Sequence, residues 1–225
     1  MTTPRAESVP TLRRWAMLVG AVAVAAIAGA LLPDLRPLHY VAKPLATLLV
    51  VLLVWRSPAP QRDYRRAVLA GLLLSTLGDI WLMLPRDAFI AGLASFLLAH
   101  LTYLFAFTRR VRLQPLRWPY FAYSVLAAAV LALLWPRLPD ALRVPVVIYV
   151  VALAAMAAQA AVVALRLPSR SSTAAALGGL IFVISDALLA IDRFHTPLSL
   201  APLWVLASYW LAQFLIGRSV WNSQA

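Results

Sequence analysis

Long apolar runs, separated by short segments rich in arginine and proline, repeat along the whole chain. Eight runs of about 17–23 residues stand out, at 14–32, 38–55, 67–84, 89–108, 119–135, 143–165, 174–191 and 198–217. At a rise of about 1.5 Å per residue, each run forms a helix long enough to cross the hydrocarbon core of a bilayer. The runs are continuous and lack the alternation of a membrane-spanning strand. The pattern therefore predicts an all-α, polytopic membrane bundle of eight transmembrane helices.

The amino-acid composition agrees with this prediction and excludes a soluble domain. Of the 225 residues, 63% are apolar and 12% are charged, and the mean hydropathy is +0.84. A soluble domain carries about 45–50% apolar and about 25% charged residues. We expect a single integral membrane domain over 1–225, with short tails at 1–13 and 218–225. The chain has no cysteine, which excludes disulfides, thiol nucleophiles and zinc thiolate sites.

The basic residues predict the orientation of the bundle. If the N-terminus is cytoplasmic, fourteen arginines fall in inner segments and five in outer segments, namely Arg36, Arg86, Arg137, Arg143 and Arg193. Cytoplasmic loops of membrane proteins carry an excess of Lys and Arg, so we expect both termini on the cytoplasmic side of the inner (cell) membrane. The net charge of +12 then reflects topology and attraction for anionic membrane lipids, and nucleic acid is not an expected partner.

Three ionisable residues lie inside the apolar runs: Lys43 in the second, Asp79 in the third and Asp186 in the seventh. An ionisable group at membrane depth costs about 2.5–3.5 kcal/mol, so its presence there indicates a function. Each of the three lies five residues from the predicted outer end of its run, which is about 7–8 Å below the outer interface. We therefore expect the three groups to share one layer of the bundle.

The two aspartates have similar neighbourhoods, each with glycine and serine close by. The fourth and eighth runs, which follow them, both carry polar groups at mid-membrane, and the bundle is therefore expected to contain two parallel four-helix halves. The candidate substrate-binding residues are Lys43, Ser75, His100, Tyr103, Ser185, Tyr209 and Gln213. Two buried carboxyl groups and one cation in a common layer suggest acid–base catalysis, because unequal surroundings leave one carboxyl protonated and the other ionised.

Structural roles for the same residues stay open at this point. Lys43 could snorkel to the outer interface, or could form a purely structural ion pair with one aspartate. His100 could equally be a hydrogen-bonding group between helices, and Tyr103, Tyr209 and Gln213 could be polar packing groups. The spacing of the histidines and the absence of thiols do not favour a metal site, and we expect neither a metal nor another cofactor.

Several short motifs, in a fixed order, resemble those of the YhhN-like lysoplasmalogenase family of multi-pass membrane proteins. The motifs are Lys43-Pro44, Leu77-Gly78-Asp79, Phe89…Gly92…His100…Tyr103, Ser185-Asp186 and Trp204…Tyr209…Gln213. The resemblance covers essentially residues 15–220. It implies an eight-helix fold and a lysolipid substrate, with hydrolysis of the vinyl ether bond of lysoplasmalogens to a fatty aldehyde and a glycerophospho-base. It also implies that Asp79 and Asp186 are the catalytic pair.

Two other classes of function would use the same residues. A di-aspartyl intramembrane protease also places a Gly-Asp pair on a helix, but its usual partner is Tyr-Asp, and this chain has Ser185-Asp186 instead. A proton-coupled lipid or small-molecule transporter would use Lys43 and the two aspartates as a relay. Product formation in detergent separates a hydrolase from a transporter, because transport needs two compartments.

Overall fold

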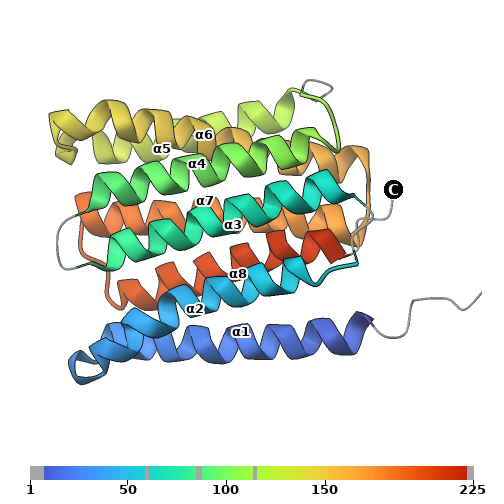
Figure 1. Ribbon diagram of the computed structural model, residues 1–225. Coiled ribbons are helices and arrows are strands. Elements are labelled where there is room, and N and C mark those ends of the chain that lie inside the picture. The colour runs from blue at the N-terminus through green and yellow to red at the C-terminus, as the bar shows by residue number, and fades with distance from the viewer. Residues whose placement is uncertain (1–7, 59–60, 85–87, 114–115, 222–225) are drawn as a thin grey trace, which may run out of the picture.

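The computed structural model describes residues 8–58, 61–84, 88–113 and 116–221, and within these residues it contains eight α-helices and no strand (Figure 1). The α-helices are α1 Ser8–Leu31, α2 Arg36–Trp55, α3 Arg62–Met83, α4 Phe89–Thr108, α5 Trp118–Leu134, α6 Asp140–Arg166, α7 Arg170–Phe194 and α8 Ala201–Trp221. Two short 3-10 helices, η1 Pro33–Leu35 and η2 Trp135–Arg137, connect α1 to α2 and α5 to α6. Each predicted apolar run coincides with one α-helix, which confirms the all-α prediction.

Of these eight helices, seven (α1 to α7) are long and apolar enough to cross a membrane, and the chain is a multi-pass membrane protein. The eighth, α8, has 21 residues and carries Ser208, Tyr209, Gln213 and Arg218, and it is not among these seven. Among the described residues, the sequence-based expectation of eight apolar spans is therefore met by seven helices. Tyr209 and Gln213 are buried against neighbouring helices, so lipid does not have to solvate them.

Several helices extend beyond the ends of the predicted runs, because helical hydrogen bonding continues through charged residues at which apolarity stops. Helix α7 ends at Phe194 rather than at residue 191, and α6 begins at Asp140 rather than at residue 143. Helices α1 and α8 extend into the two expected tails, 1–13 and 218–225. Residues 1–7 and 222–225, like the outer-segment Arg86, lie outside the described residues.

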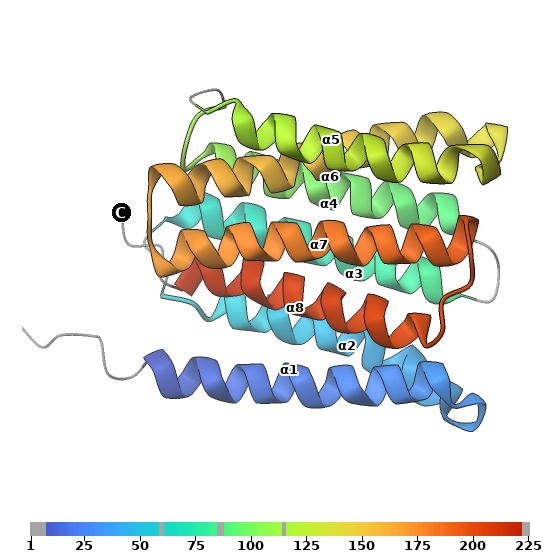
Figure 2. The same ribbon diagram turned by 180° about the vertical axis from the view of Figure 1, so that it is seen from behind.

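The helices pack as four antiparallel pairs: α1 with α2, α3 with α4, α5 with α6, and α7 with α8. Helices α3, α4, α7 and α8 form the middle of the bundle, with α1 and α2 on one flank and α5 and α6 on the other (Figures 1 and 2). Helix α2 also contacts α8, and α6 contacts α4. If α1–α4 and α5–α8 are taken as the two expected halves, the second helix of each half packs on the fourth helix of the other.

Glycines bring the central pairs into close contact at corresponding places in the two halves. A Cβ atom on Gly71 of α3 would lie 2.3 Å from the Tyr103 ring of α4. On α7, a Cβ atom at Gly178 would lie 2.8 Å from the side chain of Ile216 in α8. The helices that carry Asp79 and Asp186 are therefore each fixed to the following helix by a small-residue contact.

Candidate active site

A cavity of about 310 Å³ lies among the helices, and Lys43 of α2, Asp79 of α3 and Asp186 of α7 all line it. Residues close to helix ends form one end of this cavity, which we call the rim: Ala30, His39, Phe89, Asp192, Arg193 and Ala201. The three ionisable residues lie deeper, four to eight residues from the nearer ends of their helices. Apolar side chains of α5, α6 and α7 make up most of the remaining wall.

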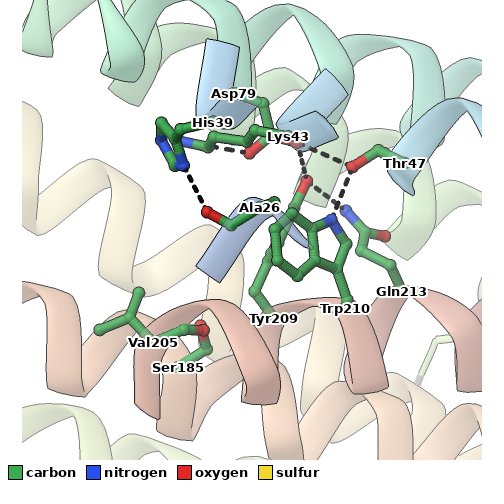
Figure 3. Close-up of polar contacts among 10 residues, drawn as sticks. All are labelled: Ala26, His39, Lys43, Thr47, Asp79, Ser185, Val205, Tyr209, Trp210 and Gln213. Carbon is green, nitrogen blue, oxygen red and sulfur yellow. Dashed lines mark hydrogen bonds and ion pairs between the residues drawn. The ribbon is translucent and has the colours of Figure 1, made fainter. Parts of the chain in front are cut away.

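Asp79 accepts hydrogen bonds from two hydroxyl groups and lies next to one ammonium group (Figure 3). Its Oδ2 atom accepts from Thr47 Oγ1 at 2.8 Å and from Tyr209 OH at 2.7 Å. Its Oδ1 atom lies 3.9 Å from Lys43 Nζ. Asp79 is only 2% exposed. Each of these three partners stabilises a negative charge on Asp79, which offsets part of the cost of burying that charge.

The direction of each hydrogen bond around Asp79 is set by a further buried group. Trp210 Nε1 donates to Thr47 Oγ1 at 3.2 Å, so the Thr47 proton points at the carboxylate. Gln213 Nε2 donates to Tyr209 OH at 3.2 Å, and Tyr103 OH donates to Gln213 Oε1 at 2.8 Å. The donors from α2, α4 and α8 therefore form two chains that end at Asp79, and chains of this kind strengthen one another.

Asp186 has a different set of partners. Its Oδ2 atom accepts a short hydrogen bond from Tyr149 OH of α6 and lies 3.4 Å from His100 Nε2 of α4. His100 Nε2 is also 2.9 Å from Tyr149 OH, so the tyrosine hydroxyl bridges the imidazole and the carboxyl group. The His100 side chain is fully buried, whereas that of Asp186 is 14% exposed. Asp186 therefore has partners that can both give and take a proton.

Aromatic rings connect the hydrogen-bond partners of Asp79 with those of Asp186. The Phe182 ring of α7 lies 4.7 Å from the His100 ring and 5.6 Å from the Tyr209 ring, measured between centroids and edge-on in both cases. Phe96 packs edge-on against Phe182 and Tyr209. These contacts hold the hydrogen-bond partners of Asp79 and Asp186 in one rigid layer.

The structure places the expected substrate-binding residues in two groups. Lys43, Ser185 and Tyr209 line the cavity with the two aspartates. The others, Ser75, His100, Tyr103 and Gln213, are buried behind its lining residues. Ser185 Oγ donates to the Val205 carbonyl at 3.0 Å, which ties α7 to α8 (Figure 3).

Lys43 does not snorkel to the end of the bundle. It is 7% exposed, and its ammonium group is the ion-pair partner of Asp79. His39 lies on the rim, one helical turn from Lys43 on the same face of α2, and its Nδ1 atom is 2.8 Å from the Ala26 carbonyl oxygen (Figure 3). The ammonium group therefore acts on the carboxylate rather than on the interface.

Three residues near the carboxyl groups or on the rim were not singled out from the sequence as site residues. Thr47 follows Lys43 by four residues, and that spacing on one helix face is the signal that could have identified it. Tyr149 lies in a very apolar stretch of α6, and nothing local indicates its partner. The predicted seventh run ends at residue 191 and leaves Arg193 in an outer segment, whereas Arg193 lies in the last turn of α7.

The chain matches the sequence model of the YhhN family over residues 38–220. It is 30% identical to membrane protein YhhN of Escherichia coli O157:H7, over 81% of this chain and 87% of the relative. It is 35% identical to a lysoplasmalogenase of Mycobacterium bovis, over 80% of this chain and 72% of the relative. A lysoplasmalogenase of Sus scrofa is 38% identical, over 71% of this chain and 66% of the relative. No solved structure matches the chain.

Proposed function

This chain belongs to the YhhN family, and we propose that it hydrolyses the vinyl ether bond of lysoplasmalogen-type lysolipids. With relatives named lysoplasmalogenase, it is a lysoplasmalogenase-like membrane hydrolase. The products of the proposed reaction are a fatty aldehyde and a glycerophospho-base. One observation carries the proposal: two carboxyl groups with unlike partners line one largely apolar cavity at membrane depth.

Hydrolysis of a vinyl ether needs one proton donor, one water molecule and one proton acceptor. Protonation of the carbon remote from the ether oxygen gives an oxocarbenium ion. Water adds to the carbon next to that oxygen and loses a proton, which gives a hemiacetal. The hemiacetal then breaks its bond to the glycerol oxygen and releases the aldehyde. Two carboxyl groups, one protonated and one ionised, are sufficient for these steps without a covalent nucleophile.

The partners of the two aspartates favour a division of roles. Asp79, with Lys43 and two hydroxyl donors, is proposed as the ionised group that stabilises the cation and takes the proton from water. Asp186, with Tyr149 and His100, is proposed as the acid that protonates the substrate carbon. Tyr149 and His100 would then hold Asp186 in place and return a proton to it.

Substitution of each aspartate by asparagine tests this function. An amide keeps the shape of the carboxyl group but neither donates a carboxylic proton nor acts as an effective base. Asp79→Asn and Asp186→Asn should therefore each lower kcat by at least about 10²-fold, the lower end for general acid–base catalysis. Because the two groups act as a unit, the double variant should be little worse than either single variant. The measurement is aldehyde release from lysoplasmalogen by purified protein in detergent.

Asp140→Asn is a matched control, because Asp140 is exposed, pairs with Arg143 and is not part of the cavity lining. This variant should keep the wild-type rate. If either folded cavity variant retains more than about a tenth of the wild-type kcat, its aspartate is not the catalytic acid or base. A wild-type protein that releases no aldehyde but moves lipid between the leaflets of a vesicle would favour a transporter.

We also propose that the protein lies in the inner (cell) membrane with both termini in the cytoplasm. The start of α1 and the end of α8 lie at the same end of the bundle (Figure 1). The excess of arginine in segments on that side supports a cytoplasmic location. The rim of the cavity would then lie toward the outer leaflet, and membrane lipid would reach the site from there.

A further inference from the structure

Helix α7 carries a second charged position on the cavity, close to its C-terminal end. Arg193 follows Asp186 by seven residues, which is two helical turns, so both residues lie on the same face of α7. The rise of the helix separates their backbones by about 10 Å. Both residues line the cavity, with Asp186 further in and Arg193 on the rim. One helix face thus presents a carboxyl group and a guanidinium group to the same ligand space.

Aromatic rings fix the position of the Arg193 guanidinium. Its Cζ atom lies 4.2 Å from the centroid of the Phe89 ring and 5.7 Å from that of Phe194. The two rings pack edge-on against each other at 5.5 Å. The guanidinium on these rings is planar, and its N–H groups form the fork that suits phosphate oxygens.

An acidic residue precedes Arg193 on the rim. This residue, Asp192, also lines the cavity. Its Oδ1 atom accepts a hydrogen bond from the Leu198 backbone N–H at 2.8 Å, which anchors the carboxylate to the α7–α8 connection. The rim therefore presents one positive and one negative group in adjacent positions, a pattern that complements a zwitterion.

Lys43 is not suited to bind a phosphate group in this cavity. Its ammonium group is buried and lies 3.9 Å from Asp79, so a second anion there would compete with the carboxylate. The glycerol backbone of a lysolipid places the phosphate a few bonds away from the ether oxygen. A phosphate on the rim would leave the ether bond near the two aspartates and the alkenyl chain along the apolar wall of α5 and α6.

We propose that the rim is the headgroup site, in which Arg193 binds the phosphodiester and Asp192 binds the ammonium group of the phospho-base. This assignment rests on the proposed lysolipid hydrolase function. It makes Arg193 and Asp192 determinants of substrate choice that take no part in breaking the ether bond. Their contacts are the same in the ground state and the transition state, so their loss acts on KM rather than on kcat.

The test compares two substrates, an alkenyl-glycerophosphoethanolamine and a 1-alkenylglycerol without phosphate. Arg193→Gln should raise KM for the phospholipid by about tenfold or more, the effect of losing a hydrogen-bonded charge, and leave kcat nearly unchanged. KM for the alkenylglycerol should not change. Arg193→Lys keeps the charge without the fork and should give an intermediate KM. Arg137→Gln, an exposed arginine in η2 outside the cavity lining, is the matched control and should behave as wild type.

Asp192→Asn tests the second half of the assignment, because the amide oxygen can still accept from the Leu198 N–H. KM should rise for alkenyl-glycerophosphoethanolamine but not for alkenyl-glycerophosphate, which has no amine. Free inorganic phosphate should inhibit far less than glycerophosphoethanolamine if the site takes a lipid headgroup, and equal inhibition would contradict that assignment. An equal rise of KM for both substrates in Arg193→Gln, or no rise, would overturn the proposal. Absence of aldehyde release by the wild type would instead overturn the hydrolase function.

Discussion

Removal of the Tyr149 hydroxyl group tests whether its hydrogen bond to Asp186 supports catalysis. Tyr149→Phe keeps the ring, which packs against His100 with centroids 5.1 Å apart, and deletes one oxygen atom. That oxygen donates to Asp186 Oδ2 and lies 2.9 Å from His100 Nε2. After the substitution, the 3.4 Å approach of His100 to Asp186 is the polar contact of this trio that remains.

The expected effect on catalysis follows from the strength of the lost contact. A hydrogen bond to a charged group contributes about 1.5–3 kcal/mol. If the bond supports Asp186 in the transition state, kcat should fall by about 10–100-fold, since about 1.4 kcal/mol corresponds to a factor of ten. KM should change little, because the hydroxyl group acts through Asp186. Loss of the partner of the buried His100 should also lower the free energy of unfolding by about 1–3 kcal/mol.

The assay is steady-state aldehyde release, with a thermal unfolding scan of each variant in the same detergent. Tyr120→Phe is the matched control, because its hydroxyl group donates to Gln159 Oε1 at a place outside the cavity lining. Both variants should unfold at lower temperature, and only Tyr149→Phe should lose kcat. If Tyr149→Phe keeps kcat within about twofold of wild type and matches Tyr120→Phe in stability, the hydroxyl group is purely structural and the reasoning fails.

Two further predictions concern the ammonium group and the orientation. Lys43→Met should lower kcat by about tenfold or more with little change in KM, because the ammonium group is next to Asp79 rather than on the rim; a rise in KM alone would instead make Lys43 a phosphate ligand. Reporter fusions at the C-terminus, with a fusion in the α7–α8 connection as control, should show a cytoplasmic C-terminus, and a signal from the opposite side would reverse the proposed orientation.

The sequence by itself predicted the membrane bundle and the depth of its ionisable groups. Apolar runs of membrane length and the asymmetry of arginines are local properties of the chain, and lipid as solvent leaves few alternatives to helices. The cost of a charge in that solvent singled out Lys43, Asp79 and Asp186 without a structure. The sequence motifs also indicated the YhhN family, whose sequence model matches residues 38–220.

The partners of these groups were decided by the tertiary structure. Tyr209 is 130 residues from Asp79, and Tyr149 is 37 residues from Asp186, yet both pairs are hydrogen-bonded. Which polar side chains of different helices come into contact depends on the rotation of each helix about its axis. It also depends on the close approach of helices at glycines such as Gly71.

The physical reason is the solvent of the bundle. A helix in water shows its buried face by an apolar stripe, whereas a helix in lipid is apolar all round, so the pattern does not tell which side faces inward. Apolarity also marks the end of a helix poorly. The predicted seventh run ends before the charged residues Asp192 and Arg193, whereas α7 continues to Phe194. The tertiary structure decides that Arg193 belongs to α7 and lines the same cavity as Asp186.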